Sequence, residues 1–504
     1  MKILENYKEI KKFFLEVRKN NNKIVFCHGV FDVLHLGHIR HFQEAKKKGD
    51  ILVVSVTSDK FVNKGFGRPY HSLKVRMQTL EALNTIDYVI PSYFSNAEHN
   101  LSLVQPNIYC KGPDYKQKPD ITENLKKEKD TLKTFSGKMH FTSDIVLSSS
   151  SLINSFKDAF NERQRKFLDI IKKKYTFEDI KLSLNKLEKL NVYVLGEVIL
   201  DQYTFCEPIG ISGKDPFIVF NKKKNNLFAG GSFAIAKNIS NFVNSSNLVS
   251  ILPKQKKNIN LLLRNKPKNL KLEKLNFKSS KEILKNRFID SNTSAKIFGL
   301  YSIDDNELTK IDKKKLISFL KKAKKKSNNF IISDYGHGFI NKEISDLVST
   351  KGFNYTLNAQ INSANRGFHG LFKYKKSNSI IINESELRYE FKDKYSTVES
   401  LIIKLSNRLK SKVIVVTRGS EGAISYSKKE GFLNCPAFYH KIVDKVGAGD
   451  ALLGVFSLCK FAGLENDLSL FLSSISGGYQ TSIINNESFL DKISLLKQID
   501  HILK

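Results

Sequence analysis

Cysteines are few in this sequence, and their spacing is unlike that of a disulfide framework or a zinc site. The five cysteines among 504 residues are widely separated, odd in number and form no CxxC pair. Disulfide-stabilised domains and structural zinc sites use closely spaced, paired cysteines. We therefore expect reduced thiols and a cytoplasmic location.

Long apolar runs are also missing. No uninterrupted apolar stretch reaches the roughly 18 residues that a membrane-spanning helix requires. The opening residues MKILENYKEIKKFF carry glutamates where a secretion signal has a continuous apolar segment. Neither export nor a membrane partner is indicated. Hydrophobic and charged fractions of 41% and 26% are those of a globular protein, and 504 residues predict two or three domains.

Acidic residues are outnumbered by basic ones, 50 to 83, which gives a net charge of +33. Such an excess can mark a nucleic-acid or anionic-membrane partner. Here the lysines are spread along the chain in short runs such as KKAKKKSNN and NKKKNN, instead of being concentrated in one arm. We interpret the charge as a solvated surface and expect no specific nucleic-acid partner. A nucleic-acid-binding protein stays open as an alternative of a different class, supported only by the charge.

Residues 1–155 follow the pattern of a parallel α/β domain. The segment KIVFCHGVF (23–31) predicts a buried strand, the next segment predicts a helix that stops at Gly49, and DILVVSVTSD (50–59) predicts a second strand. This spacing is typical of a right-handed βαβ unit. Further strands are predicted at 87–92, 107–112 and 138–143, so we expect a Rossmann-like sheet of parallel strands.

Two histidines flank a glycine where the first of these helices begins, in GVFDVLHLGHIRHF (29–42). A helix N-terminus directs unpaired N–H groups toward the carboxyl end of the preceding strand, where α/β folds bind ligands. The imidazoles of His35 and His38 could donate hydrogen bonds to phosphates there, and Gly37 would let a phosphate approach the backbone. The pattern indicates nucleotidyl transfer, in which the protein stabilises charge on the α-phosphate. A chance pair of histidines near a turn is the alternative.

The same stretch resembles the GxFDxxHxGH signature of the cytidylyltransferase-like nucleotidyltransferases. The segments TSDKFVNKGFGRPYHSLKVRMQTLEAL (57–83) and CKGPDY (110–115) resemble the sugar-phosphate adenylyltransferase half of ADP-heptose synthases. The resemblance implies that His35 and His38 are catalytic, that Asp32 braces the loop, and that Lys64 and Arg76 supply positive charge. The other nucleotide- and phosphate-binding positions that it implies are Val30, Phe31, Gly37, Lys111, Asp114, Ser148, Ser149 and Ser150.

The serine run departs from some relatives. They place an arginine close to the hydroxyls, whereas VLSSSSLINSF contains none. The sequence therefore leaves open which cation neutralises pyrophosphate. By itself, a run of four serines is equally typical of a polar loop.

Residues 156–189 predict a helical connector, because they are charged, show helical periodicity and contain neither glycine nor proline. A new sheet begins at NVYVLGEVIL (191–200), and predicted strands and helices alternate from there to the C-terminus. We therefore expect a second α/β domain over residues 190–504.

A glycine-rich turn leads into an apolar helix in VDKVGAGDALLGVFSLCKFAG (443–463). The backbone amides of Gly447, Ala448 and Gly449 would form an anion hole for a transferring γ-phosphoryl group. Asp450 is suited to act as the general base toward an acceptor hydroxyl. No GK[ST] sequence follows, so the turn is not a Walker A loop.

Two further motifs support phosphoryl transfer. In NESE (383–386), Asn383 and Glu386 supply an amide and a carboxylate suited to ordering a hydrated Mg²⁺ near the phosphates, by way of water. In AGGSFAIAKNIS (229–240), the paired glycines Gly230 and Gly231 precede a helix that contains Asn238, an arrangement suited to close approach of a sugar.

These motifs, in this order, resemble those of the PfkB or ribokinase-like carbohydrate kinases, whose fold is an α/β domain with a small β lid. The early segment LGEVILDQY (195–203) and VTRGSEGA (416–423) belong to the same resemblance. It implies that Asp201 and Asp450 contact the sugar, and that Thr417 and Gly419 contact the nucleotide.

Several positions depart from that family's pattern. Glu197 stands where aspartate is usual, and His337 replaces lysine in SDYGHGFI (333–340). Lys445 and Val446 replace small hydroxyl residues before GAGD, and LNAQINSANRGFHG (357–370) occupies the place of a DPK-like segment. The identity of the sugar and the position phosphorylated therefore stay open.

Together the two modules resemble the bifunctional kinase/nucleotidyltransferases of ADP-heptose synthesis, in reversed order. The resemblance implies that the kinase domain phosphorylates a heptose-phosphate-like sugar with ATP. The transferase domain would join a nucleotide, expected from ATP with CTP left open, to a sugar 1-phosphate and release pyrophosphate for lipopolysaccharide or another cell-surface sugar. It also implies a homodimer through lid strands near 202–228. A CTP-using transferase of a polyol phosphate and a kinase module that has lost catalysis are the remaining alternatives.

Overall fold

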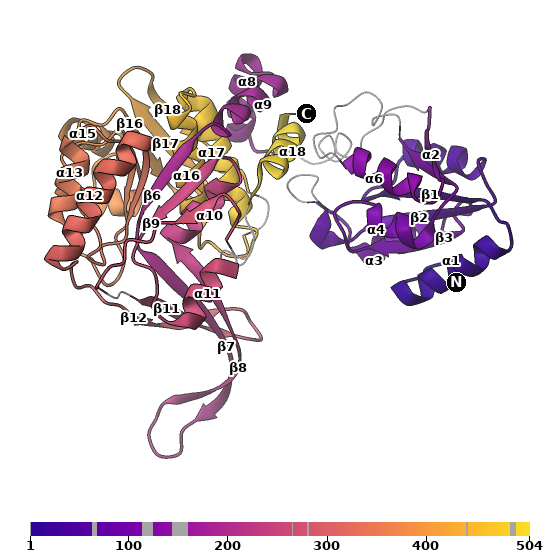
Figure 1. The fold of residues 1–504 in the computed structure, drawn as a ribbon, viewed down its shortest axis with the longest axis horizontal. Helices are drawn as coiled ribbons and strands as arrows, with labels where there is room; N and C mark the ends of the chain where they lie inside the picture. The colour runs from indigo at the N-terminus through magenta and orange to yellow at the C-terminus, as the bar shows by residue number, and fades with distance from the viewer. Residues whose placement is uncertain are drawn as a thin grey trace. The chain divides into compact units, whose positions relative to one another are not determined.

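The structure is a computed structural model that describes residues 2–62, 68–112, 124–143, 160–264, 266–279, 282–439, 442–483 and 490–503. The chain divides into two compact units (Figure 1). The first comprises Met1–Asn161 and Leu496–Lys504, and the second comprises Glu162–Leu495. Among the described residues, no helix is long and apolar enough to cross a bilayer.

The first unit contains a five-stranded sheet in the order β3-β2-β1-β4-β5, and every neighbouring pair is parallel. The strands are β1 (Ile24–Gly29), β2 (Ile51–Thr57), β3 (Tyr88–Ser92), β4 (Ile108–Lys111) and β5 (Lys138–Phe141). Each lies within two residues of its predicted bounds. The predicted parallel α/β fold is confirmed, and the strand order reverses between β1 and β4, where such sheets bind ligands.

Helices cover both faces of this sheet because the side chains of each strand alternate between faces. Val25 and Cys27 of β1 pack on one side with helices α2 (Leu36–Lys46) and α3 (Leu73–Glu81). Ile24 and Phe26 pack on the other side with α1 (Tyr7–Lys19), α4 (Glu98–Val104) and α6 (Asn124–Lys133). The sheet is therefore buried on both faces, and ligands can reach it only at its edges and strand ends.

The second unit contains a nine-stranded sheet in the order β10-β9-β6-β13-β14-β15-β16-β17-β18. Its strands are β6 (Asn191–Gly196), β9 (Ser245–Val249), β10 (Leu270–Leu272), β13 (Asn329–Asp334), β14 (Asn354–Ala359), β15 (Ser379–Asn383), β16 (Val413–Thr417), β17 (Ala423–Ser427) and β18 (Gly431–Cys435). Pairing is parallel from β10 to β16 and antiparallel for the last two strands. The carboxyl ends of the parallel strands thus meet at one edge, where the candidate kinase motifs lie.

Two layers of helices enclose this sheet (Figure 1). One layer contains α12 (Lys310–Lys326), α13 (Lys342–Thr350), α14 (Glu384–Phe391) and α15 (Val398–Leu409). The other contains α10 (Ser232–Ser240), α16 (Ala448–Phe461) and α17 (Asn466–Gln480), of which α10 contacts β9 and α16 contacts β13. Helix α11 (Lys256–Arg264) also belongs to the second unit, and α18 (Lys492–Leu503) spans the division between the two units.

A separate four-stranded sheet, which we call the lid, has the order β12-β11-β7-β8. Its strands are β7 (Val198–Ile211), β8 (Ile218–Gly231), β11 (Ile283–Asp290) and β12 (Lys296–Ser302). The tip of the β7–β8 hairpin projects away from the rest of the second unit (Figure 1). Four apolar side chains near this tip are exposed: Ile209, Ile211, Phe217 and Ile218.

The helices α8 (Glu162–Lys174) and α9 (Phe177–Leu187) lie in the segment predicted as a connector and belong to the second unit. Phe167 of α8 is buried against Phe438 and Phe471. Lys174 forms an ion pair of 2.7 Å with Asp467. These contacts hold α8 against the rest of the second unit. The domain boundaries drawn from the sequence remain a prediction.

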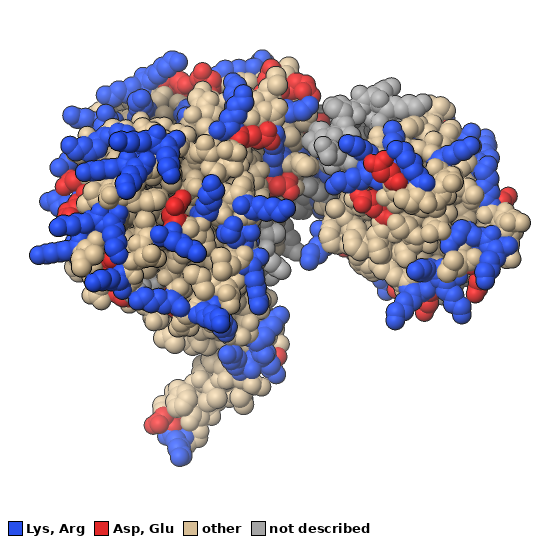
Figure 2. Space-filling view, viewed as in Figure 1, with Lys and Arg blue, Asp and Glu red and all other residues tan. Residues whose placement is uncertain are grey.

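Lysine and arginine are distributed over the visible face of each unit, with acidic residues between them (Figure 2). In this view the basic residues do not gather into one stripe or groove. Such an arrangement is typical of a solvated basic surface.

Candidate active sites

The first candidate site lies where helix α2 begins, beyond the end of β1. His35 is the N-cap residue of α2, and the imidazole rings of His35 and His38 stack with centroids 3.8 Å apart and planes inclined by 20°. Phe31, whose backbone φ is +48°, meets the His38 ring edge to face at 5.4 Å. The two predicted histidines are thus held side by side at a helix N-terminus, a position that favours an anion.

Asp32 binds residues 68, 70 and 71, which follow in a later loop, to this site. Its carboxylate accepts hydrogen bonds from the backbone amides of Tyr70 at 2.8 Å and His71 at 2.9 Å, and from the Arg68 guanidinium at 2.9 Å. Burial alone would raise the pKa of Asp32, but these three donors outweigh it and lower the pKa below its ordinary value. Asp32 is therefore ionised at neutral pH and bonds residues 68, 70 and 71 to the loop after β1.

Arg76 is a second brace. Its guanidinium is fully buried and donates to the backbone oxygens of Val30 at 2.6 Å, Thr57 at 2.8 Å and His71 at 2.9 Å. It also forms a 2.6 Å ion pair with Asp59. These bonds tie the loop after β1 to the end of β2. A direct contact of Arg76 with a phosphate stays a prediction, because it would require these bonds to rearrange.

Lys111, at the end of β4, forms a buried 2.7 Å ion pair with Glu128 of α6. This pair joins the end of β4 to α6, and a contact of Lys111 with a phosphate stays a prediction. Gly37 lies in the first turn of α2. The predicted residues Lys64, Asp114, Ser148, Ser149 and Ser150 lie outside the described part of the chain.

The second candidate site is a cavity of about 440 Å³ at the carboxyl edge of the nine-stranded sheet, between that sheet and the lid. It brings together most of the predicted kinase residues. These are Asp201, Gly231, Asn383, Glu386, Thr417, Gly419, Gly447, Gly449 and Asp450. Residues separated by up to 249 positions in the sequence therefore share one cavity large enough for a small ligand.

Asp450 lies in the first turn of α16, whose N-cap is Gly447 with φ of +86°. The first intrahelical bond runs from the Ala451 amide to the Gly447 oxygen at 2.9 Å, so the amides of Ala448 and Gly449 precede the helical ladder. Burial raises the pKa of Asp450 to about 7. A carboxylate with this pKa can accept a proton from a hydroxyl near neutral pH, beside amides oriented to bind an anion.

Asn383 and Glu386 form a capping box at the start of α14. The Asn383 side-chain oxygen accepts from the Glu386 amide at 2.8 Å, and the Glu386 carboxylate accepts from the amides of Asn383 at 3.1 Å and Ile361 at 3.2 Å. Burial raises the pKa of Glu386 to about 7. The motif therefore has a structural role in the helix as well as lining the cavity.

The donor set suits a hydrated magnesium ion better than a tightly ligated metal. The oxygens of Asn383 and Glu386 keep lone pairs beyond those used in the capping box, and Mg²⁺ usually retains several waters. Within the described ranges, no three His, Cys, Asp or Glu side chains converge in a way that could hold a metal ion. An ion here would thus depend on water and on phosphates for most of its ligands.

Asp201 closes the lid side of the cavity. Its carboxylate forms a 2.5 Å ion pair with Arg287 of β11, and a Cβ at Gly230 would lie 2.3 Å from the Asp201 oxygen. Gly231 adopts φ of +61°, and a Cβ there would lie 2.6 Å from the backbone oxygen of Glu197. Gly231 is therefore required by the close approach of the lid strands, whereas a Cβ at Gly230 would meet the end of the Asp201 side chain.

Asn238 is separate from this cavity. It lies on α10, seven residues beyond Gly231, is buried, and is not among the residues that line the cavity. Its predicted contact with a sugar has no support in this arrangement and stays a prediction.

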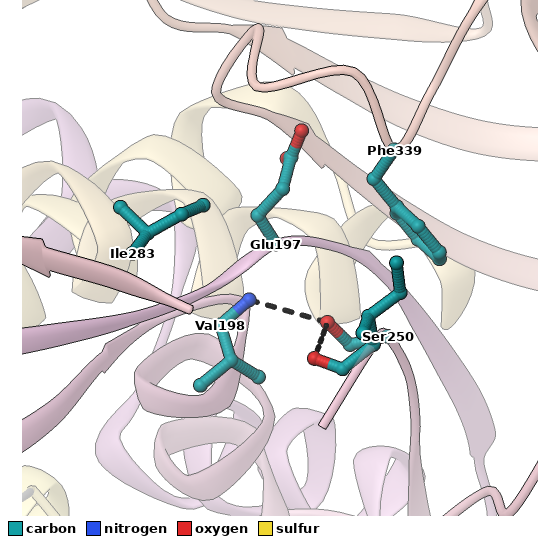
Figure 3. Close-up of a pocket in the computed structure, with 6 residues that line it drawn as sticks. Glu197, Val198, Ser250, Ile283 and Phe339 are labelled. Atoms are coloured by element: carbon teal, nitrogen blue, oxygen red, sulfur yellow. Dashed lines mark hydrogen bonds between the residues drawn. The ribbon is translucent and has the colours of Figure 1, made fainter. Parts of the chain in front are cut away.

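A second, much smaller cavity of about 10 Å³ lies beside the start of the lid strand β7. It is lined by Glu197, Val198, Ser250, Ile283 and Phe339 among others (Figure 3). It is just large enough for one water molecule. The Val198 amide donates to the Ser250 hydroxyl at 3.2 Å, and the Glu197 carboxylate points away from that serine (Figure 3). Its size excludes a sugar or nucleotide, so the larger cavity is the candidate site.

Comparison with known proteins agrees with this geometry. Residues 189–474 match the family model described as pfkB family carbohydrate kinase. The chain belongs to the pfkB family. This pfkB unit aligns with a crystal structure of a phosphofructokinase-2 variant from Escherichia coli, with a TM-score of 0.50 and 14% identity, over 62% of this chain and all of that one. The predicted kinase fold with its lid is confirmed.

The first unit matches a different model. Residues 26–156 match the model described as cytidylyltransferase-like, which confirms the predicted nucleotidyltransferase-like domain. Two curated relatives are named bifunctional protein HldE. That of Nitratiruptor sp. is 36% identical over 127 residues, 25% of this chain and 28% of its own length. That of Pseudomonas putida is 42% identical over 102 residues, 20% and 22% of the two chains. The matched segment thus spans less than a third of either relative.

Sequence reasoning missed several residues that line the pfkB cavity. Lys285 and Arg287 lie two residues apart on β11, and both line the cavity. Side chains two residues apart point to the same face of a strand. That signal was available in EILKNRF (282–288). Tyr335 and Gln360 lie in loops, and only the packing of those loops brings them to the cavity.

Proposed function

We propose that this chain prepares a nucleotide-activated sugar at two separate active sites. In the pfkB unit, a sugar hydroxyl attacks the γ-phosphorus of ATP, Asp450 takes the hydroxyl proton, and ADP leaves. In the first unit, an oxygen of a sugar 1-phosphate attacks the α-phosphorus of a nucleoside triphosphate, and pyrophosphate leaves. The observation that carries the kinase proposal is the position of Asp450, beside the amides at the start of α16 and inside the cavity.

The stacked histidines support the transferase proposal. His35 and His38 lie at the N-terminus of α2, at the point where the strand order reverses. Donors fixed at that position can stabilise negative charge that develops on the α-phosphate without moving during the reaction. We expect ATP as the nucleotide, and CTP is the competing choice, since the matched family model is described as cytidylyltransferase-like.

The acceptor is proposed to be a heptose-phosphate-like sugar. Support comes from the local similarity to proteins named HldE and from Lys285 and Arg287, two cations on one wall of the kinase cavity that suit an anionic substrate. Magnesium would bind beside Asn383 and Glu386, where it supplies charge neutralisation for the phosphates of ATP. All five cysteines are unpaired and buried, which supports work in a reducing compartment such as the cytoplasm.

We further propose a homodimer through the lid. Ile209 and Ile211 of β7 and Phe217 and Ile218 near the start of β8 are at least 57% exposed, so the hairpin presents an apolar surface that a second copy could cover.

The experiment that tests the two activities follows pyrophosphate and ADP separately. Purified protein is incubated with ATP or CTP, Mg²⁺ and a panel of sugars and sugar 1-phosphates. We expect His38→Ala to abolish pyrophosphate release only, and Asp450→Asn to abolish ADP formation only. If no sugar 1-phosphate gave pyrophosphate, the transferase proposal would be wrong. If no sugar gave ADP, the kinase proposal would be wrong. One substitution that abolished both products would contradict two independent sites.

A further inference from the structure

Among the described residues, the side chain that donates a hydrogen bond to Asp450 is Tyr335, through its hydroxyl. The Tyr335 oxygen lies 3.3 Å from Oδ1 of Asp450, and the tyrosine side chain is buried at the edge of the cavity. Burial and the negative charge of Asp450 raise the pKa of Tyr335 well above its ordinary value. The hydroxyl therefore keeps its proton and remains a donor across the range in which a kinase works. A distance of 3.3 Å is long for such a bond, as is common where a catalytic bond tightens only when substrate is present.

The loop that carries Tyr335 is held from both sides. Glu197 accepts two of its backbone amides, those of Tyr335 and His337, each at 3.1 Å. On the other side, the Tyr335 backbone oxygen accepts the side-chain amides of Asn362 at 3.1 Å and Asn365 at 2.8 Å. The tyrosine thus has little freedom to move away from Asp450.

The same loop is packed too tightly to shift. Gly336 has φ of +73°, and a Cβ there would lie 2.5 Å from the Asn365 side chain and 2.6 Å from the His369 ring. Glu197 and the segment 357–370 are two of the places where this sequence departs from the usual pfkB pattern. In the structure both contact the loop that carries Tyr335, and that loop places the Tyr335 hydroxyl beside the Asp450 carboxylate.

We propose that Tyr335 is a positioning residue that orients Asp450 toward the acceptor hydroxyl and stabilises its ionised form, and that Glu197 holds Tyr335 in place. The inference rests on the proposed kinase function. A hydroxyl that donates to Oδ1 fixes the rotation of the short carboxylate, so that Oδ2 faces the cavity. It also favours the charged base over the protonated one, since a donor stabilises the anion it contacts.

Other charged groups line the cavity around Asp450 and form the electrostatic surroundings in which Tyr335 acts on it. They are Asp201 on β7, Lys285 and Arg287 on β11, Glu386 on α14 and Lys445 in the loop before α16. Asp201 opposes ionisation of Asp450 and Lys285 favours it. All of them remain in place in a variant that removes only the Tyr335 hydroxyl, so a change in titration can be assigned to that bond.

The test compares Tyr335→Phe with the parent chain over pH 5.5 to 9. We expect the acidic midpoint of kcat/KM for ADP formation to rise by roughly half to one pH unit, because the ionised base loses its donor. That shift corresponds to a loss of about 3- to 10-fold on the acidic limb, with most activity regained at high pH. Glu197→Gln is the second variant, since the two loop N–H groups bond different carboxylate oxygens and glutamine replaces one of these with an NH2 donor. It should move the midpoint in the same direction by a smaller amount.

Tyr355→Phe is the matched control. Tyr355 of β14 is equally buried, and its hydroxyl donates to the Lys376 backbone oxygen, away from the cavity. Its loss should lower the thermal midpoint without moving the pH profile. If Tyr335→Phe lowered activity equally at every pH, or raised only the KM for the sugar, Tyr335 would be a packing or substrate-binding residue and the inference would be wrong.

A second readout does not depend on turnover. Infrared difference spectra between the chain and its Asp450→Asn variant report protonation of this one carboxyl during a pH titration. We expect the midpoint near 7 in the parent, and a higher midpoint when the Tyr335 hydroxyl is removed. An unchanged midpoint overturns the inference. A shifted midpoint in a chain that makes no ADP upholds the inference and removes the proposed kinase function.

Discussion

Gly230 offers a quantitative test of how the lid places Asp201. In Gly230→Ala the new Cβ would lie 2.3 Å from an oxygen of Asp201, whereas unstrained contacts are about 3.5 Å. The carboxylate must therefore move by roughly 1 Å away from β8, out of the position in which it now lines the cavity. Overpacking of this kind costs about 1–3 kcal/mol.

If that energy is lost from sugar binding, the KM for the sugar should rise by about 10- to 100-fold, since 1.4 kcal/mol is roughly a factor of ten. The assay is ADP formation at varied sugar concentration, with pyrophosphate release by the first unit as an internal check that should not change. Gly213→Ala is the control, because a Cβ at Gly213 in the hairpin turn meets nothing within 4 Å. A Gly230→Ala chain with the parent's KM would refute the placement of Asp201 against the sugar.

Three further predictions concern other parts of the molecule. Arg76→Leu should lower the free energy of unfolding of the first unit by roughly 2–4 kcal/mol in urea denaturation, because three backbone oxygens lose a buried donor. The pKa of Asp32 is lowered in the folded state, so its stabilising effect is present above the unfolded pKa of about 3.9 and is lost as pH falls through the folded value. Asp32→Asn should therefore destabilise the chain at pH 7, and the unfolding midpoints of the two chains should converge as the pH falls through the lowered pKa of Asp32. Ile211→Lys should convert the proposed dimer to a monomer in light scattering, and an unchanged mass would exclude the hairpin as the interface.

Much of the fold could be predicted from local patterns. Strands of the first unit were placed within two residues because buried parallel strands read as short apolar runs between polar turns. The turn at Gly447 and the NxxE pair were recognisable for a related reason. Their chemistry depends on residues adjacent in sequence, such as the amides that precede Asp450.

Other roles depended on packing and could not be predicted. The resemblance implies that Arg76 supplies positive charge to the site, and the structure adds that its guanidinium donates to three backbone oxygens and pairs with Asp59. The NxxE motif also proved to be a capping box, since Asn383 and Glu386 bond each other's backbone amides. A sequence shows that a side chain can donate or accept, but its partner is chosen by whatever the fold brings within about 3 Å.

The sequence by itself determined that two α/β modules share this chain and that each has a glycine-containing turn at a helix N-terminus, because those features are built from consecutive residues. Only the tertiary structure decided which distant side chains complete each site. Tyr335, Lys285 and Arg287 reach the cavity of Asp450 from a loop and a lid strand more than 100 residues away in sequence. Their approach is set by sheet order and loop packing, which are long-range properties that no local spacing encodes.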